Sequence, residues 1–198
     1  MTNDIAKLRR LVLCITGASG SIYARRCLQI LSDKAIGRVA DLEVHWIASR
    51  NAPQVWQSEL NEPMPSSFGP SCRNWDRFDF SAPFASGSNP ADAVLVMPCS
   101  MSALARIAHG GGEDLISRSC DVALKERRRL ILVVRETPLS KIHIHNMLKV
   151  TEAGAIVLPA VPSFYSGVTT LEQAIDTVVV RALDHCGCPL DLRPRWGS

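Results

Sequence analysis

Five short apolar runs, separated by amphipathic segments, most strongly restrict what this 198-residue chain can fold into. The runs are rich in Val, Ile and Leu and show little polar alternation, which predicts strands of a mostly parallel sheet covered on both faces. Helical stripes accompany them, with Tyr23, Cys27 and Leu31 on the first and Leu171 to Leu183 on the last. This alternation predicts an α/β fold with a doubly wound sheet. The five predicted strands are 11–16, 42–48, 93–98, 130–135 and 155–159.

The length and the apolar content of 46% suit one large core, so we expect residues 1–198 to form a single domain. Residues 61–92 interrupt the alternation with five prolines and an excess of serine and glycine. This composition predicts a long loop excursion over the surface.

The charge pattern does not favour a nucleic-acid partner. The formal net charge is only +3, and the basic residues are scattered apart from Lys125 and 127–129. That basic cluster is typical of a solvated helix end. No apolar stretch approaches the roughly 18 residues of a membrane span, and we expect a cytoplasmic protein.

The seven cysteines form an odd number, and Cys14 and Cys99 fall inside apolar runs. They are therefore interpreted as buried thiols in a reducing compartment. No CxxC pair occurs, and His143 and His145 are two positions apart, which would place them on different sides of a helix. We expect no metal site.

The first predicted strand leads into Gly17, Ala18, Ser19 and Gly20 before the first helix. In a doubly wound sheet, ligands bind beyond the carboxyl ends of the strands, where a helix N-terminus attracts anions. The spacing lacks the GxGxxG of dinucleotide sites, so a mononucleotide phosphate fits better than NAD. An ordinary turn with Ser19 as the helix cap is the simpler interpretation, and it stays open.

Two further strand ends carry polar residues. Ser100 and Ser102 lie in PCSMSA, where they can cap a helix, bind a ligand, or do both. Arg135 and Glu136 end a strand too apolar for the surface, and they are either a structural ion pair or part of a site. Arg181 lies off the apolar stripe of the last helix, which alone indicates a solvated arginine.

Taken together, six blocks of sequence resemble those of the UbiX-type flavin prenyltransferases, in the same order, from about residue 10 to residue 197. GASG is a weak motif by itself, whereas the KERR, RETP and PxFY blocks at this spacing are specific. The blocks are TGASG (16–20), ASGS (85–88), MPCS (97–100), DVALKERRRLILVVRETP (121–138), HNMLKVTEAGAIVLPAVPSFY (145–165) and PRW (194–196).

The resemblance implies a Rossmann-like flavoprotein that forms a homo-oligomer, a dodecamer in the family. Its reaction would join a dimethylallyl group from dimethylallyl phosphate to N5 and C6 of reduced FMN, without a metal. The prenylated FMN would then pass to a partner decarboxylase of the UbiD type.

The resemblance also implies roles for individual residues. For catalysis these are Glu136, as the acidic residue that moves a proton, and Ser19, as its hydroxyl neighbour. The implied FMN-binding residues are Gly17, Ala18, Ser19, Ser49, Ser100, Met101, Ser102, Ala103 and Arg135. The donor phosphate and prenyl group would be held by Tyr165, Arg181, Lys125, Arg118 and Trp196.

Three positions depart from the family pattern. Arg50 stands where the family has lysine, Ala103 stands where threonine is commoner, and Ser166 follows the tyrosine where the family often has histidine and then proline. Arg50 keeps the positive charge of the lysine but not its geometry. Ala103 would keep the backbone N–H contacts and lose a hydroxyl contact, and the altered loop after Tyr165 bears on how tightly the donor is held.

Alternatives to prenyl transfer remain at this point. A flavodecarboxylase of the cysteine type would place a catalytic histidine after the first helix region and lack the RETP block, whereas His45 lies within a predicted strand. A non-catalytic flavin carrier would bind FMN without turnover.

Overall fold

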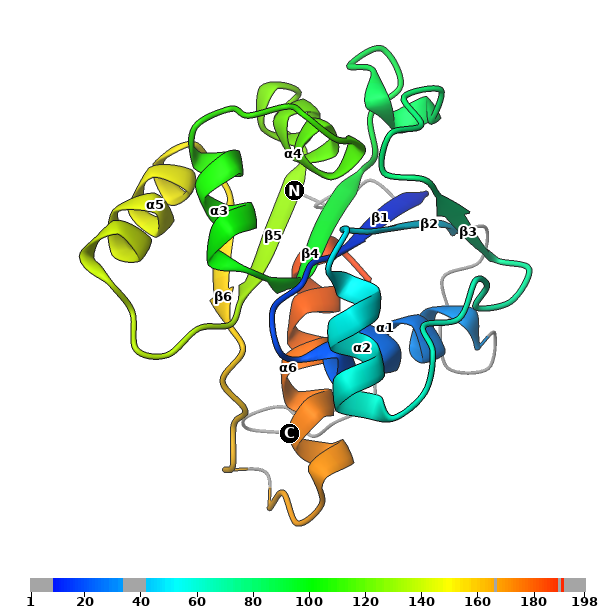
Figure 1. Ribbon diagram of the computed structural model, residues 1–198, viewed down its shortest axis with the longest axis vertical. Coiled ribbons are helices and arrows are strands. Elements are labelled where there is room, and N and C mark those ends of the chain that lie inside the picture. Colours follow the sequence, from blue (N-terminus) through cyan, green and yellow to red (C-terminus); the bar gives the residue numbers. More distant parts are fainter. Residues whose placement is uncertain (1–8, 34–41, 166, 189, 191–198) are drawn as a thin grey trace, which may run out of the picture.

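The protein is described here by a computed structural model that covers residues 9–33, 42–165, 167–188 and 190. Six strands form one sheet in the order β3-β2-β1-β4-β5-β6, and every neighbouring pair is parallel (Figure 1). The strands are β1 (Arg10–Ile15), β2 (Glu43–Ala48), β3 (Cys72–Trp75), β4 (Ala93–Cys99), β5 (Arg129–Val134) and β6 (Ile156–Pro159). The predicted doubly wound α/β fold is confirmed, and within the described residues the sheet is wholly rather than mostly parallel.

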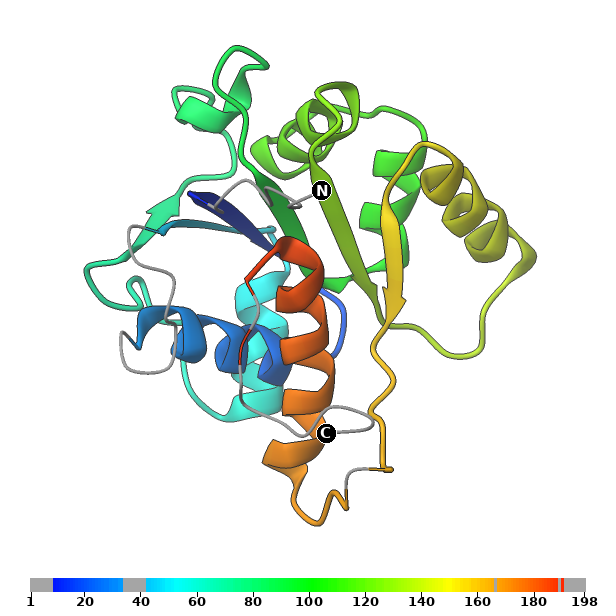
Figure 2. The same ribbon diagram turned by 180° about the vertical axis from the view of Figure 1, so that it is seen from behind.

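Six α-helices cover the two faces of this sheet. Figures 1 and 2 show α1, α2 and α6 on one side and α3, α4 and α5 on the other. The helices are α1 (Ser21–Ser32), α2 (Ala52–Leu60), α3 (Met101–Ala108), α4 (Leu115–Lys125), α5 (Lys141–Glu152) and α6 (Leu171–Cys186). A short 3-10 helix, η1 (Pro83–Ala85), lies between β3 and β4.

Strand β1 shows how one sequence supplies both cores. Leu11 and Leu13 pack into the cluster shared with α1 and α6, while Val12 and Cys14 pack into the cluster shared with α3 and α4. All four side chains are fully buried. Successive strand residues point to opposite faces, so a strand covered on both sides has to be apolar throughout.

Residues 61–92, the segment predicted as a long loop excursion, are irregular over most of their length but hold two short elements that the sequence did not indicate. The segment contains η1 and also β3, which extends the sheet beyond β2 with Cys72 opposite Val44. Arg73 and Asn74 are exposed at this edge, so the four-residue strand lacks an apolar run. Trp75 fastens it by donating its indole N–H to Nδ1 of His45 at 2.9 Å.

Other expectations are settled by burial. Leu171, assigned to the apolar stripe of the last helix, is instead 69% exposed. The seven cysteines are buried free thiols, as predicted, and His45 is buried in β2. Lys125 is exposed at the end of α4, and Arg127 and Arg128 are exposed just beyond it, as expected of a solvated helix end. Arg129 instead begins β5, and its guanidinium donates to the carbonyl of Cys186 at 2.9 Å. In the part of the chain that the structure describes, no helix is both long and apolar enough to cross a membrane.

Candidate functional site

The carboxyl ends of three adjacent strands are fastened together by hydrogen bonds. The N–H of Ser49, after β2, donates to the carbonyl of Ile15 in β1 at 2.8 Å. The Thr16 hydroxyl donates to the carbonyl of Pro98 at 2.7 Å and accepts from the N–H of Ser100 at 2.9 Å. These bonds hold the turns after β1, β2 and β4 in fixed positions at the edge where doubly wound sheets bind ligands.

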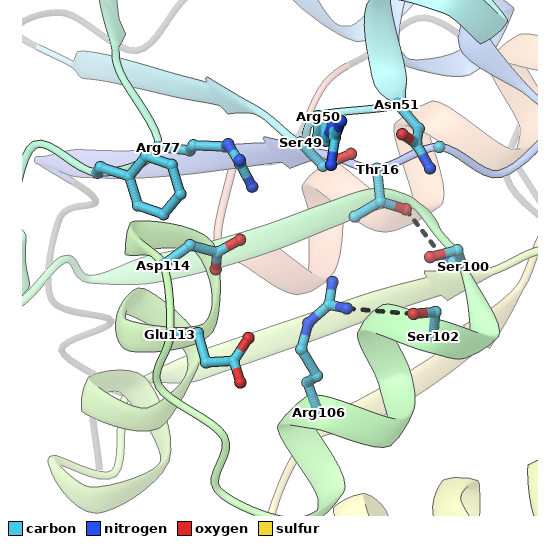
Figure 3. Close-up of a pocket in the computed structure, with 12 residues that line it drawn as sticks. Thr16, Ser49, Arg50, Asn51, Arg77, Ser100, Ser102, Arg106, Glu113 and Asp114 are labelled. Carbon is cyan, nitrogen blue, oxygen red and sulfur yellow. Dashed lines mark hydrogen bonds between the residues drawn. The ribbon is translucent and has the colours of Figure 1, made fainter.

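A cavity of about 550 Å³ opens over these strand ends (Figure 3). Its size lies within the ~300–1,000 Å³ typical of small-molecule sites. Four predicted flavin-binding residues, Gly17, Ser49, Ser100 and Ser102, line it. The rest of the lining comes from Thr16, Arg50, Asn51, Arg77, Phe78, Arg106, Glu113 and Asp114. Among the described residues, no group of three His, Cys, Asp or Glu side chains could hold a metal ion.

Two local features leave backbone N–H groups accessible from this cavity. A Cβ on Gly17 would lie 2.8 Å from the Cβ of Asn51, so only glycine lets the turn pass so close to the start of α2. Ser100 is the N-cap of α3, and its hydroxyl accepts from the N–H of Ala103 at 3.2 Å. The N–H groups of Met101 and Ser102 have no partner within the helix and point out of its N-terminus. The site therefore offers backbone donors to an anion.

The turn after β1 already binds a carboxylate, that of Glu59 on α2. Its oxygens accept from the N–H of Gly20 at 3.0 Å and of Ser21 at 2.8 Å, and the Ser19 side chain also bonds to it. Gly20, with φ at 117°, is the N-cap of α1, so the interpretation of Ser19 as the cap was wrong. Partial burial acts to raise the pKa of Glu59, but these hydrogen bonds outweigh it and hold the pKa below its ordinary value. Sequence reasoning missed Glu59, since nothing near it in the chain marks it.

The remaining predicted flavin-site residues surround the cavity without lining it. Ala18, Met101 and Ala103 are buried beneath the two turns. Arg135 is exposed after β5, and its N–H donates to the carbonyl of Cys99 at 3.2 Å, so it lies at the same edge of the sheet. Burial raises the pKa of Tyr23 on α1, and the positive charge of Arg135 partly offsets that rise.

Two of the predicted donor-site residues come from α6 and from the loop that is hydrogen-bonded to it. The N–H of Ser163 donates to the Thr177 hydroxyl at 3.1 Å, which fixes the loop after β6 along this helix. Tyr165 comes two residues later in that loop, and Arg181 lies one helical turn beyond Thr177. Both Tyr165 and Arg181 are exposed, as is Glu136 after β5.

Arg118 and Lys125 lie elsewhere in the chain. Both are on α4, which packs on the opposite face of the sheet from α6. Lys125 ends α4, just before the start of β5 at Arg129, whereas Glu136 follows the end of that strand. A six-residue strand that rises about 3.3 Å per residue separates its two ends by roughly 20 Å. A single chain therefore does not bring Lys125 to Glu136. Trp196 and Ser166 lie outside the described residues.

Comparison with known proteins gives this arrangement a family context. The family model described as Flavoprotein matches residues 2–182. A curated relative from Methanocaldococcus jannaschii, named flavin prenyltransferase UbiX, is 44% identical over 189 residues, covering 96% of this chain and 99% of the relative. The protein of the same name from Pseudomonas aeruginosa is 40% identical, with 96% of this chain and 94% of the relative covered.

Solved structures agree. The crystal structure of AnUbiX (PadA1) in complex with FMN and dimethylallyl pyrophosphate matches with a TM-score of 0.87 and 41% identity over 96% of this chain and 98% of that one. A dodecameric FMN-dependent UbiX-like decarboxylase from Escherichia coli matches with a TM-score of 0.84 and 33% identity over 96% and 100%. An FMN-dependent cysteine decarboxylase, TvaF, is only 17% identical at a TM-score of 0.59, with 92% of this chain and 99% of TvaF covered, and shares the fold alone.

Proposed function

Because this chain belongs to the UbiX-type flavin prenyltransferases of the Flavoprotein family, we propose that it transfers a dimethylallyl group from dimethylallyl phosphate to N5 and C6 of reduced FMN. The observation that carries the proposal is the polar cavity at the joined carboxyl ends of β1, β2 and β4, into which the N-terminus of α3 opens. Reduced FMN, when bound there, supplies the nucleophilic ring positions. Gly17, Ser49, Ser100 and Ser102 would hold it.

The donor phosphate would bind Arg181 on α6 and Tyr165 in the loop after β6, which Ser163 joins to the same helix through Thr177. A phosphate is a poor leaving group, so a cation and a hydroxyl donor aimed at its oxygens lower the barrier to breaking the allylic C–O bond. Arg181 also supplies a planar donor set that matches phosphate oxygens. Trp196 stays a predicted aromatic neighbour of the prenyl group.

Closing the new ring at C6 releases a proton, and two carboxylates are candidates to accept it. Glu136 is the one that the resemblance implies. Glu59 is the one that the structure adds, because its carboxylate bonds to the side chain of Ser19. Ser19 would then relay the proton to Glu59. Glu136→Gln and Glu59→Gln should each retain FMN, and the variant that lacks the true acceptor should form product slowly.

We further propose that a second copy completes the donor site, because Lys125 and Arg118 are on the far side of the sheet from Arg181. Large apolar side chains exposed on α5 and on the loop after β6 support contact between copies. They are Ile142, Ile144, Leu148, Val161 and Phe164, each at least 51% exposed. A homododecamer, the assembly named for the E. coli relative, would satisfy this need.

Mixed oligomers test the shared site. Lys125→Gln and Arg181→Ala should each abolish most turnover when present in every copy. If each site takes the two residues from different copies, co-expressing both variants restores roughly one quarter of the sites. No recovery in oligomers shown to contain both variants would contradict the second-copy proposal.

The product would pass to a decarboxylase of the UbiD type in the cytoplasm. Seven buried free thiols support a reducing compartment. A purified UbiD-type apoenzyme that gains decarboxylase activity on mixing with the loaded protein would bear out the transfer.

The experiment for the central reaction is an anaerobic incubation of the purified protein with reduced FMN and dimethylallyl phosphate, followed by the mass of the flavin. We expect a gain of one five-carbon unit. A parallel sample with dimethylallyl pyrophosphate, the compound named in the AnUbiX complex, tests the donor. If the bound FMN keeps its mass with both donors, the proposed prenyltransferase activity is wrong, and the alternative of a non-catalytic flavin carrier is favoured.

A further inference from the structure

Three arginines line the flavin cavity, and neither sequence motif nor resemblance gave any of them a role. Arg50 follows β2, Arg77 follows β3, and Arg106 is on α3. Figure 3 shows the guanidinium groups of Arg77 and Arg106 turned into the space over the strand ends. Three elements far apart in the sequence thus direct cations at one volume.

These guanidinium groups lack carboxylate partners. Five other arginines of the described residues do hold one: Arg10 with Glu43, Arg25 with Glu62, Arg26 with Asp176, Arg118 with Asp121 and Arg128 with Asp92. Across the described residues, no Asp or Glu oxygen comes within 4.0 Å of the guanidinium nitrogens of the three cavity arginines. Arg77 stacks over the Phe78 ring at 4.1 Å, and Arg106 donates to the Ser102 hydroxyl at 3.1 Å. Their charges remain available to an anion.

Two carboxylates do line the cavity, and they do not cancel this charge. Asp114 is turned toward the start of α4, where it accepts from the N–H of Ser117 at 2.9 Å and from its hydroxyl at 2.7 Å. Glu113 is exposed, so solvent screens it. Three guanidinium groups therefore face a single unengaged carboxylate.

Arg106 also points to the same place as the N-terminus of α3. Ser102 is in the first turn, Arg106 lies one turn later on the same side, and their hydrogen bond holds the guanidinium beside the open end of the helix. Unpaired N–H groups, the helix dipole and a cation together favour a multiply charged anion such as a phosphate monoester.

We propose that Arg106, positioned by Ser102 and supported by the charges of Arg50 and Arg77, binds the phosphate of the flavin mononucleotide and makes this chain select FMN over riboflavin. The inference rests on the proposed function, since FMN is the ligand of that function.

Flavin binding rather than turnover tests the inference. The protein is titrated with FMN and, separately, with riboflavin, and the dissociation constants are read from quenching of flavin fluorescence. Arg106→Gln should raise the dissociation constant for FMN by about ten- to one-hundred-fold, the range for losing a charge-assisted contact to phosphate. The dissociation constant for riboflavin, which has no phosphate, should change by less than about twofold because no charged contact is lost. The control, Arg25→Gln, removes a half-buried arginine outside the cavity and should alter neither constant.

Arg106→Lys provides a second variant that preserves the charge but not the planar donors, and it should recover part of the FMN affinity. Equal changes for FMN and riboflavin, or no change for either, would overturn the inference while the wild-type protein still binds FMN. A loss confined to dimethylallyl phosphate would place the arginines at the donor and would also overturn it. Failure of the wild-type protein to bind FMN would instead count against the proposed function.

Discussion

Removing the Glu59 carboxylate should loosen the start of α1. Its oxygens accept from the N–H of Gly20 at 3.0 Å and of Ser21 at 2.8 Å, while Gly20, the N-cap residue, has no side chain to cap the helix. Glu59 thus caps α1 from another helix. Losing a capping acceptor costs about 0.5–2 kcal/mol of the free energy of unfolding. Because Glu59 is partly exposed and water replaces some of the lost bonds, we expect about 1 kcal/mol for Glu59→Ala.

The same carboxylate should contribute to pH dependence. Its pKa is lower in the folded protein than its ordinary value of 4.5, so the unfolded chain takes up a proton first as the pH falls. The stabilisation by Glu59 is therefore complete above that value and is lost as the pH falls through the lower, folded pKa. Glu59→Gln keeps the size of the side chain but removes the charge. The free energy of unfolding of this variant should therefore fall less as the pH is lowered.

Urea unfolding followed by far-ultraviolet circular dichroism, at pH 7 and at about pH 3.5, measures both effects. Chain concentration must stay fixed because assembly also stabilises the fold. Glu62→Gln is the matched control: its ion pair with Arg25, at 3.3 Å, is partly exposed and should be worth less than about 0.5 kcal/mol. A Glu59→Ala protein no less stable than this control would show that water caps α1 and would refute the reasoning.

Three other substitutions have expected outcomes. Gly17→Ala places a Cβ about 2.8 Å from that of Asn51 and should cost about 1–3 kcal/mol in urea unfolding, while adding Asn51→Gly should restore most of the loss. Ser100→Ala removes the cap of α3 and should cost about 1 kcal/mol in the same assay and weaken FMN in fluorescence titration. Arg26→Gln breaks the half-buried bidentate pair with Asp176, at 2.6 and 2.8 Å, and should lower stability by about 1–3 kcal/mol, seen as a lower urea midpoint.

The buried strands could be predicted because each is an apolar run covered on both faces, and burial leaves that pattern in the sequence itself. Strand β3 could not be predicted, since it lies at the sheet edge with Arg73 and Asn74 exposed. It is held by its pairing with β2 and by the hydrogen bond from Trp75 to His45. Leu171 misled for the opposite reason: it continues the helical period of α6 yet is exposed.

The candidate site was predictable where it depends on strand ends. Ser49 and Ser100 follow recognisable strands, and parallel topology brings such ends together. Glu59 and Arg106 were not recognised, because each acts across a contact that local sequence does not reveal. Lys125, in contrast, was predicted for the site but is not brought to it by the fold of one chain. The family resemblance places it at the donor, whereas the topology puts it at the far end of β5 in any single chain.

The most direct measurement of the central claim is a crystal structure of this protein with FMN bound. We predict that the flavin occupies the cavity lined by Gly17, Ser49 and Ser100, with its phosphate within about 3 Å of the N-terminus of α3 and of Arg106. Flavin density located anywhere else, for instance in the groove between α1 and α6, would contradict the claim.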